Sequence, residues 1–352
     1  MDKVKIGIIG LQHLHPRSYM AHFRSIKEIE VVCAADSDAE LLQRFSNDFQ
    51  LKAYLDWRQM LDRESLELVA IFLPHVQCPD AAIYAIERGM NVIVEKPMAA
   101  DQRAAEKMAL AAEKSGVVLT TPYVWRFHPV VWDIRQLISD GILGRIIGCE
   151  GRCAAGRLSR YLEGHAGWML DAHQSGGGPM YNLGVHWIDL FAWLLGEPIV
   201  SAFGKNVKVN QQYNIEDNSF AILTFQNGAI LNLDISYTVP DSYPHGRDLY
   251  IGIRGTKGVI QWAPAYEGER DELFICSDHE LFRSAPVQRR LYELLPVTGY
   301  SGVMGLEYLK AVIEAIQKKL PAPITAHDGA RVLKIVEAIY RSAQTHQVVE
   351  IA

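Results

Sequence analysis

The first 122 residues alternate short apolar runs with segments of helical periodicity, and this alternation constrains the fold more than any other feature. The apolar runs cover residues 4–9, 29–35, 68–73, 91–94 and 117–120. A helical pattern over residues 80–88 ends at Gly89, a residue type that commonly terminates helices. Short, fully apolar strands separated by helices form parallel sheets that are covered on both faces. Residues 1–122 are therefore predicted to form an α/β domain with a doubly wound parallel sheet.

The pattern changes after residue 145. Residues 219–225 and 230–237 flank Gln226-Asn227-Gly228, and Asn-Gly between two β-rich runs is a strong hairpin signal. Residues 249–253 and 259–262 repeat this layout around a second glycine-containing turn, and helical patterns cover residues 187–195, 305–318 and 329–345. Residues 123–352 are therefore predicted to form a second, α+β domain with a largely antiparallel sheet.

Composition excludes several classes of function. The chain of 352 residues has a formal net charge of -6, and no basic block is longer than Lys318-Lys319, so neither nucleic acid nor an anionic membrane surface is expected as a partner. The five cysteines are scattered, which favours a reducing compartment. Lys5 interrupts the first apolar run, and no run approaches the roughly 20 residues of a membrane span. We expect a cytoplasmic protein.

The stretch GIIGLQHLHP at residues 7–16 resembles a dinucleotide-binding turn with two glycines replaced. Gly10 keeps the role of the first glycine, while Gln12 and His15 occupy the positions of the second and third. A helix is expected to begin at Pro16, so that its first amides face an anion. The backbone of residues 12–14, which includes His13 and Leu14, is predicted to lie beneath a pyrophosphate.

An acidic residue follows the second predicted strand, at Asp36-Ser37. A carboxylate there accepts hydrogen bonds from both ribose hydroxyls and repels a 2′-phosphate, so Asp36 argues for NAD over NADP. Considered alone, Gly10 and Asp36 are equally compatible with an ordinary turn and an ordinary strand end, and this pair leaves both interpretations open.

Two further stretches carry groups suited to catalysis. Glu95-Lys96-Pro97 follows a predicted parallel strand, where ligands gather in such sheets. Asn182 and His186 are four residues apart in a predicted helix and therefore lie on one face.

These motifs resemble the Gfo/Idh/MocA family of NAD(P)-dependent oxidoreductases, and the resemblance covers nearly the whole chain. It rests on Glu95-Lys96-Pro97, Arg126-Phe127-His128-Pro129, Trp168 and Asp171 before the triple glycine 176–178, Asn182/His186/Asp189, Arg254-Gly255-Thr256-Lys257-Gly258, and residues 323–342. The resemblance implies an N-terminal Rossmann domain and a C-terminal substrate-binding and oligomerisation domain with an open, mostly antiparallel sheet. The implied reaction is hydride transfer between the nicotinamide and a secondary alcohol or ketone of a sugar, cyclitol or related polyol.

The resemblance also assigns residues to roles. The implied catalytic set is Lys96, Asn182 and His186, and a cis peptide is expected before Pro97. The predicted cofactor-binding residues are Gly10, Gln12, His13, Leu14, Asp36, Ser37, Leu73, Pro74, His75, Glu95 and Lys96. The predicted substrate-binding residues are Tyr123, Arg126, His165, Trp168, Asn182 and His186.

The chemistry requires such groups independently of the resemblance. When an alcohol loses hydride, its hydroxyl proton must leave to a base, and histidine titrates near neutrality. A lysine has an ordinary pKa of about 10.4, so it is better suited to stabilising developing alkoxide charge. We assign His186 as the acid/base and Lys96 as the polarising group, with the reverse assignment open.

Several features depart from the family pattern or remain open. Asn182 stands where many relatives carry aspartate, and Leu73-Pro74-His75 stands where a Pro-Asn pair is common. Trp168 packs either near the nicotinamide or in the core of the second domain, and Asp189 either binds ligand or braces its helix. The histidines form no H-x-x-x-H helix, so no metal is expected. An open sheet needs cover, which predicts a homodimer or homotetramer.

Two alternative functions stay open at this point. The altered turn favours an enzyme that retains NAD for transient oxidation in elimination, epimerisation or glycoside cleavage. The replacements Gln12, His15 and Asn182 also suit a non-catalytic regulator of the same fold that binds NAD or another ligand.

Overall fold

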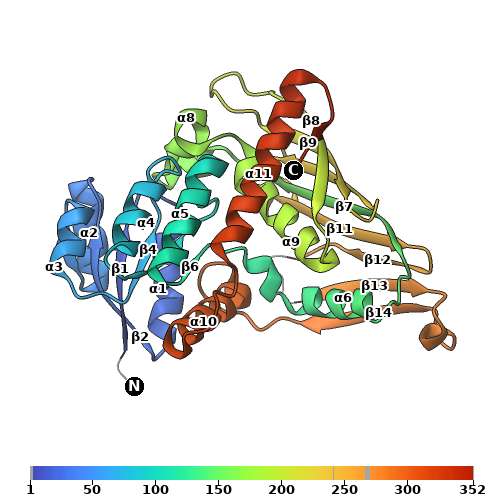
Figure 1. Ribbon diagram of the computed structural model, residues 1–352, viewed down its shortest axis with the longest axis horizontal. Helices are drawn as coiled ribbons and strands as arrows, with labels where there is room; N and C mark the ends of the chain where they lie inside the picture. The colour runs from blue at the N-terminus through green and yellow to red at the C-terminus, as the bar shows by residue number, and fades with distance from the viewer. Residues whose placement is uncertain (1–2, 241, 266–269, 352) are drawn as a thin grey trace. The chain divides into compact units, whose positions relative to one another are not determined.

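A computed structural model describes residues 3–240, 242–265 and 270–351 (Figure 1). Internal contacts group the chain into two compact units. Unit 1 comprises Met1–Pro122, Leu158–Gly177 and Val297–Leu333, and unit 2 comprises Tyr123–Arg157, Gly178–Pro296 and Lys334–Ala352. Two later segments of the sequence therefore pack with the first 122 residues.

Unit 1 is built on a six-stranded sheet in the order β3-β2-β1-β4-β5-β6 with all neighbours parallel. The strands are β1 Val4–Ile9, β2 Ile29–Ala35, β3 Lys52–Tyr54, β4 Leu68–Ile71, β5 Asn91–Val94 and β6 Leu119–Thr120. The predicted doubly wound parallel sheet is confirmed. The edge strand β3 was not predicted, because it has three residues and two of them are exposed.

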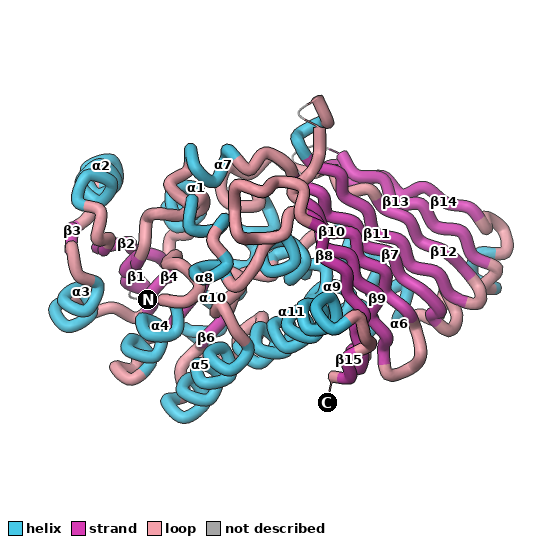
Figure 2. The backbone as a smooth tube through the Cα atoms, turned by 90° about the horizontal axis from the view of Figure 1, so that it is seen from above, coloured by secondary structure: helices cyan, strands magenta, loops and turns pink. Residues whose placement is uncertain are grey.

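Helices cover both faces of this sheet, as Figure 2 shows. They are α1 Pro16–Ser25, α2 Ala39–Phe49, α3 Trp57–Arg63, α4 Cys78–Ile86 and α5 Gln102–Ser115. The later helices α7 Ser159–Glu163, α8 Ala172–Ser175 and α10 Gly302–Lys318 belong to the same unit. Helix α1 begins at Pro16, as expected. Because β1 lies between β2 and β4, the loops that follow these three strands meet at one edge of the sheet, where parallel sheets bind ligands.

Unit 2 is built on a nine-stranded sheet in the order β14-β13-β12-β11-β7-β10-β9-β8-β15. The strands are β7 Ile146–Ala155, β8 Ile199–Val207, β9 Asn218–Phe225, β10 Ile230–Ser236, β11 Arg247–Gly255, β12 Gly258–Trp262, β13 Arg270–Ser277, β14 Val287–Glu293 and β15 Val349–Glu350. Only the β7–β10 pair among them is parallel, so the predicted mostly antiparallel sheet is confirmed. The predicted hairpin at Asn227-Gly228 joins β9 and β10.

The helices of unit 2 pack on one face of its sheet. They are α6 Pro129–Ser139, α9 Val185–Leu195 and the second half of α11 Ala326–Thr345. Gly151 of β7 permits close approach of α9, because a Cβ atom there would lie 2.3 Å from the ring of Trp187. Large apolar side chains on β8 and β9 remain exposed, namely Phe203 (40%), Phe220 (40%) and Ile222 (46%).

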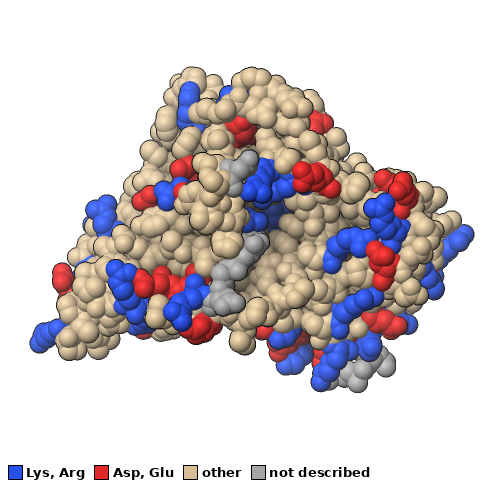
Figure 3. Space-filling model, turned by 180° about the vertical axis from the view of Figure 1, so that it is seen from behind, with Lys and Arg blue, Asp and Glu red and all other residues tan. Residues whose placement is uncertain are grey.

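Two surface properties bear on possible partners. On the face drawn in Figure 3, basic side chains lie among acidic and uncharged ones, so that face offers a polyanion no continuous basic surface. Among the helices in the described ranges, none combines the length and hydrophobicity needed to cross a bilayer.

Candidate active site

The turn after β1 requires glycine at its first position. Gly10 has a φ of +86°, and a Cβ atom there would lie 2.8 Å from the backbone carbon of Phe72 and 2.9 Å from the backbone nitrogen of Leu73. Both the left-handed conformation and the close approach to the end of β4 exclude a side chain. The first glycine role of a dinucleotide turn is therefore retained.

Side-chain hydrogen bonds hold the position that usually carries the second glycine. The Asp36 carboxylate accepts from the amide of Leu11 at 2.6 Å, from the side chain of Gln12 at 3.0 Å and from the amide of Asp38 at 2.8 Å. The indole of Trp168 donates to the carbonyl oxygen of Gln12 at 2.7 Å. Gln12 is thus anchored at both its side chain and its backbone, and Asp36 supports the turn itself.

A pocket of about 600 Å³ lies at the carboxyl ends of β1, β2 and β4 in unit 1, within the size range of small-molecule sites. It collects six of the predicted cofactor-binding residues, Gly10, Gln12, Asp36, Ser37, Leu73 and Pro74, together with His165 and Trp168, which were predicted to bind substrate. Trp168 therefore packs in unit 1 rather than in the core of the second sheet. Its ring lies 4.8 Å from that of His75, edge to face.

The same pocket contains residues that the sequence analysis did not single out, including Trp57, Gln77 and Gln174. Trp57 starts α3 directly after the unpredicted strand β3, and Gln77 lies in the loop after β4. For both Trp57 and Gln77, the signal available in the sequence was their location shortly after a strand. Gln174 lies in α8, a segment distant in sequence that no local pattern connects to this edge.

The remaining predicted cofactor residues lie deeper or beside the pocket. His13, His75, Glu95 and Lys96 are buried, and Leu14 is half-buried. The Nδ1 atom of His75 donates to the carbonyl oxygen of Ser175 at 2.7 Å, and burial lowers the pKa of His75 to about 4. A neutral His75 therefore keeps its Nε2 lone pair as an acceptor.

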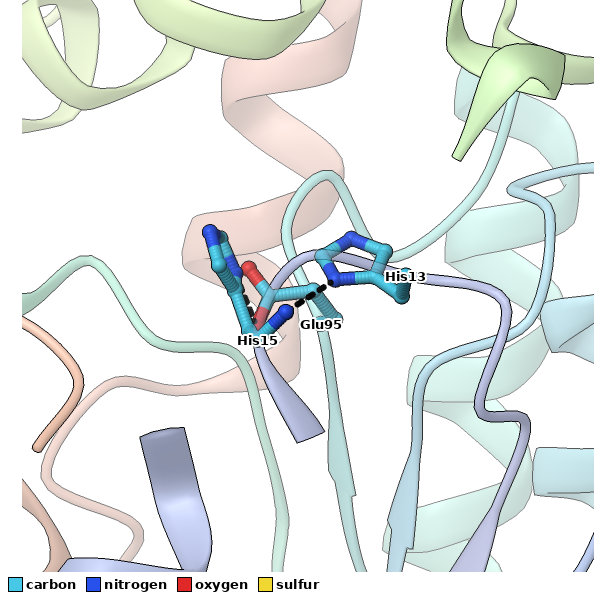
Figure 4. A group of neighbouring side chains, drawn as sticks. All are labelled: His13, His15 and Glu95. Carbon is cyan, nitrogen blue, oxygen red and sulfur yellow. Dashed lines mark hydrogen bonds and ion pairs between the residues drawn. The ribbon is translucent and has the colours of Figure 1, made fainter. Parts of the chain in front are cut away.

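His13, His15 and Glu95 form a compact cluster, drawn in Figure 4, whose candidate ligand atoms all lie within 4.8 Å of one another. The amide of His15 donates to Nδ1 of His13 at 3.1 Å, and Nδ1 of His15 lies 3.2 Å from a carboxylate oxygen of Glu95. Burial lowers the pKa of His13 and raises the pKa of Glu95. Because Nδ1 of His13 accepts a hydrogen bond from the His15 amide, a neutral His13 carries its proton on Nε2 and has no lone pair left for a metal ion. The absence of a metal stays a prediction.

Lys96 follows β5 and is 2% exposed. The Lys96–Pro97 peptide bond is cis, as expected.

In unit 2, Asn182 and His186 lie on consecutive helical segments. Asn182 belongs to a single π-helical turn, Met180–Gly184, and His186 belongs to the α9 helix that follows. Such π turns are rare and occur frequently at functional sites. The Asn182 amide donates to the hydroxyl of Tyr237 at 2.9 Å, and the ring of Tyr123 lies 6.0 Å from that of His186. Three predicted site residues, Tyr123, Asn182 and His186, are therefore neighbours.

Arg126 and Asp189 form a buried ion pair in the same unit. Nε of Arg126 donates to Asp189 at 2.8 Å and Nη2 donates to the other carboxylate oxygen at 2.5 Å. Asp189 thus holds the guanidinium of a predicted substrate-binding residue, a role that differs from both binding ligand and bracing its own helix.

Sequence comparison identifies the family. Residues 4–123 match the model described as "Oxidoreductase family, NAD-binding Rossmann fold", and residues 135–351 match the model described as "Oxidoreductase family, C-terminal alpha/beta domain". The chain belongs to the Gfo/Idh/MocA family. This Gfo/Idh/MocA protein is therefore an oxidoreductase with an NAD-binding domain, and the interpretation as a non-catalytic regulator is set aside.

Curated relatives and solved structures agree with the assignment. The Gfo/Idh/MocA protein is 24% identical to the D-glucoside 3-dehydrogenase of Escherichia coli K12 over 99% of its own length and 97% of the relative. It is 25% identical to the NADP(+)-dependent scyllo-inositol 2-dehydrogenase IolW of Bacillus subtilis 168, over 98% and 95%. An oxidoreductase domain protein of Kribbella flavida has the same fold, with a TM-score of 0.86, 22% identity and full coverage of both chains.

Proposed function

We propose that this protein is an NAD-dependent dehydrogenase or reductase that interconverts a secondary alcohol and a ketone on a sugar, cyclitol or related polyol. The observation that carries the cofactor part is Asp36, whose carboxylate lines the unit 1 pocket at the end of β2. The substrate class rests on the relatives, which are named as dehydrogenases of a glucoside and of an inositol.

The residues of the pocket fit a dinucleotide. Gly10 allows close approach of the turn to the end of β4, and α1 begins with Pro16 directly after the turn. Among the described residues, Oδ2 of Asp36 accepts only the Leu11 amide and so keeps one acceptor position for a ribose hydroxyl. Bound NAD supplies the hydride acceptor. The pyrophosphate is expected over the backbone of residues 12–14 and the start of α1.

The protein's own groups then handle the hydroxyl proton and the developing charge. We assign His186 to take the proton of the alcohol and Lys96 to donate a hydrogen bond to the reacting oxygen. Asn182 cannot relay a proton, and its amide is oriented by the Tyr237 hydroxyl, so its proposed role is to position a substrate hydroxyl.

The role of Asp36 predicts the cofactor preference. Wild type should bind NAD⁺ at least tenfold more tightly than NADP⁺, a difference of about 1.4 kcal/mol, because the carboxylate repels a 2′-phosphate. Asp36→Asn should reduce this preference, whereas Asp48→Asn, which removes an exposed carboxylate paired with Arg17, should leave it unchanged. Calorimetric titration with both cofactors measures the ratio. A wild type that prefers NADP⁺ would contradict the assignment.

Turnover tests the remaining roles. Wild type should reduce NAD⁺ with at least one member of a panel of inositols, glucosides and other sugars, and Lys96→Met or His186→Asn should lower kcat/KM by about 100-fold or more. The exposed residues Lys107 and His173 provide matched controls, since Lys107→Met and His173→Asn should retain activity. Silence of the wild type across the panel, or full activity of both site variants, would contradict the proposal. Product formation without net cofactor reduction would support transient oxidation by retained NAD instead.

The exposed apolar side chains of unit 2 support a homo-oligomer. Phe203, Phe220 and Ile222 lie on neighbouring strands β8 and β9, and a patch of this kind is usually covered by protein. Light scattering on the purified protein should give a dimer or tetramer mass. Phe220→Glu should lower that mass, whereas a monomeric wild type would refute the expectation.

A further inference from the structure

The last glycine of the triple glycine segment makes an unusual set of contacts in unit 2. The amide of Gly178 lies 3.2 Å from each carboxylate oxygen of Glu216 and 3.1 Å from the hydroxyl oxygen of Tyr340. The Tyr340 hydroxyl in turn donates to Glu216. One backbone amide, one carboxylate and one phenol thus form a closed triad of hydrogen bonds that precedes the π turn.

Glycine is required at this position by the carboxylate residue itself. A Cβ atom at Gly178 would lie 2.1 Å from the backbone oxygen of Glu216 and 2.8 Å from its carboxyl carbon. Glu216 therefore occupies the space that a side chain would need, and the fit of the two residues fixes the backbone of the turn.

The triad connects to Asn182 through the backbone on one side. The carbonyl oxygen of Gly178 accepts from the amide of Asn182 at 3.2 Å. On the other side, the connection runs through Asp217, the residue after Glu216. The carbonyl oxygen of Asp217 accepts from the amide of Tyr237 at 2.8 Å, and the hydroxyl of Tyr237 accepts from the side-chain amide of Asn182 at 2.9 Å.

Asp217 is itself held rigidly. Its carboxylate accepts from the amide of Val209 at 2.8 Å and from the amide of Asn210 at 2.6 Å, and the residue is 4% exposed. Glu216 and Asp217 together therefore hold the start of the π turn and the hydroxyl that orients Asn182.

We propose that Glu216 is a positioning residue which, together with Tyr340, fixes Gly178 and thereby sets the placement of Asn182 and the start of the α9 helix that carries His186. The importance of Asn182 and His186 for turnover rests on the function proposed above. The fixing of the turn by Glu216 does not, because it follows from the hydrogen bonds and the close packing of unit 2.

The protonation state of Glu216 affects this arrangement. Burial raises its pKa to about 7, while the bonds from Tyr340 and Gly178 act to lower it and the neighbouring Asp217 charge adds to the rise. Tyr181 is a further titratable group at this place, and its ring packs on that of Tyr340 at 5.1 Å. Because burial outweighs these hydrogen bonds, the closed triad favours protonated Glu216, and an opening that exposes the carboxyl to solvent becomes easier as the pH rises through this pKa.

Hydrogen–deuterium exchange of peptides that span residues 178–186 tests the proposal without any need for turnover. At pH 8, Glu216→Gln and Tyr340→Phe should each speed exchange of this segment at least tenfold, whereas Glu293→Gln, which removes an exposed carboxylate paired with Arg270, should not. After correction for intrinsic rates, the wild type should gain protection between pH 8 and pH 6, because opening the triad then also requires release of the Glu216 proton, and Glu216→Gln should show no such gain. If Glu216→Gln fails to fold, Tyr340→Phe decides the matter alone.

Unchanged exchange of residues 178–186 in the folded variants would overturn the proposal. If the wild type turns over substrate, Glu216→Gln should also lower kcat at least tenfold and leave the dissociation constant of NAD within twofold, because the cofactor pocket lies in unit 1. A positive exchange result in a protein without turnover would refute the proposed function and retain the positioning role.

Discussion

The Arg126–Asp189 pair allows a quantitative test of how unit 2 is held together. Arg126 is 8% exposed and Asp189 is 2% exposed, and two hydrogen bonds of 2.8 Å and 2.5 Å join them. Removing one partner of such a pair leaves the other charge buried and costs about 3–5 kcal/mol. Asparagine can still accept one of the two bonds, so Asp189→Asn should fall at the lower end of this range, near 3 kcal/mol.

A double substitution separates the cost of an unpaired charge from the net value of the pair. Arg126→Met combined with Asp189→Leu removes both charges and replaces them with apolar side chains of similar size. Such replacements of buried pairs are often neutral or stabilising, so the double variant should recover most of the loss and lie within about 1 kcal/mol of wild type.

Urea unfolding followed by far-UV circular dichroism measures these differences, with equal m-values as the condition for comparing midpoints. The exposed pair Arg270–Glu293 provides the control, because Glu293→Gln should cost less than about 1 kcal/mol. A loss of unfolding free energy in Asp189→Asn as small as that of this control would show that Arg126 is not left as an unpaired buried charge. A double variant no more stable than Asp189→Asn would show the same.

Three further predictions follow from local geometry. Gly10→Ala should abolish NAD binding in a calorimetric titration, since its Cβ would lie 2.8 Å from the Phe72 backbone at a φ of +86°; binding at wild-type affinity would exclude the proposed turn. Burial raises the pKa of Cys33 and Cys149 to about 12 and also raises the pKa of Cys78, so these three thiols stay protonated and unreactive at pH 8. A thiol reagent at pH 8 should therefore modify Cys276, the least buried cysteine, before any of them. The folded-state pKa of Glu216 lies near 7, against an ordinary value of 4.5, so the folded protein holds this proton more tightly than the unfolded chain does. The wild type therefore loses stability as the pH rises from 4.5 to 7, whereas Glu216→Gln has no such proton to lose. The unfolding free energy of Glu216→Gln minus that of the wild type should rise by roughly 3 kcal/mol over this interval and stay level above pH 7.

The fold was largely predictable from the sequence where burial is extensive. The apolar runs at β1, β2 and β5 coincide with the strands, because most residues of these parallel strands are buried and therefore apolar. The strand β3 was missed since Lys52–Tyr54 carries no such run. The π turn Met180–Gly184 was missed as well, because its residues show the same apolar pattern as the α-helix that follows.

The candidate site was predictable only where a motif encodes it. Gly10, Asp36 and Lys96 follow predicted strands and could be placed from that position alone. The contact between Trp168 and Gln12 joins residues 156 positions apart, and the triad of Gly178, Glu216 and Tyr340 joins three separate segments. No local periodicity reports such contacts, so Glu216 was not singled out and the alternatives for Trp168 and Asp189 stayed open.

The bond from Gln12 to Asp36 changes what a glycine fingerprint means in this protein. In a standard turn, single glycines determine the backbone conformation. Here the hydrogen bond between Gln12 and Asp36, which follow adjacent strands, fixes the turn, and the Trp168 indole adds a further bond to the backbone of Gln12. Gln12→Gly would therefore not recreate a standard turn, because it removes the amide donor that occupies the carboxylate and frees a backbone that the pair had fixed. Searches for dinucleotide sites with this architecture should look for the amide–carboxylate pair across the two strand ends rather than for the missing glycines.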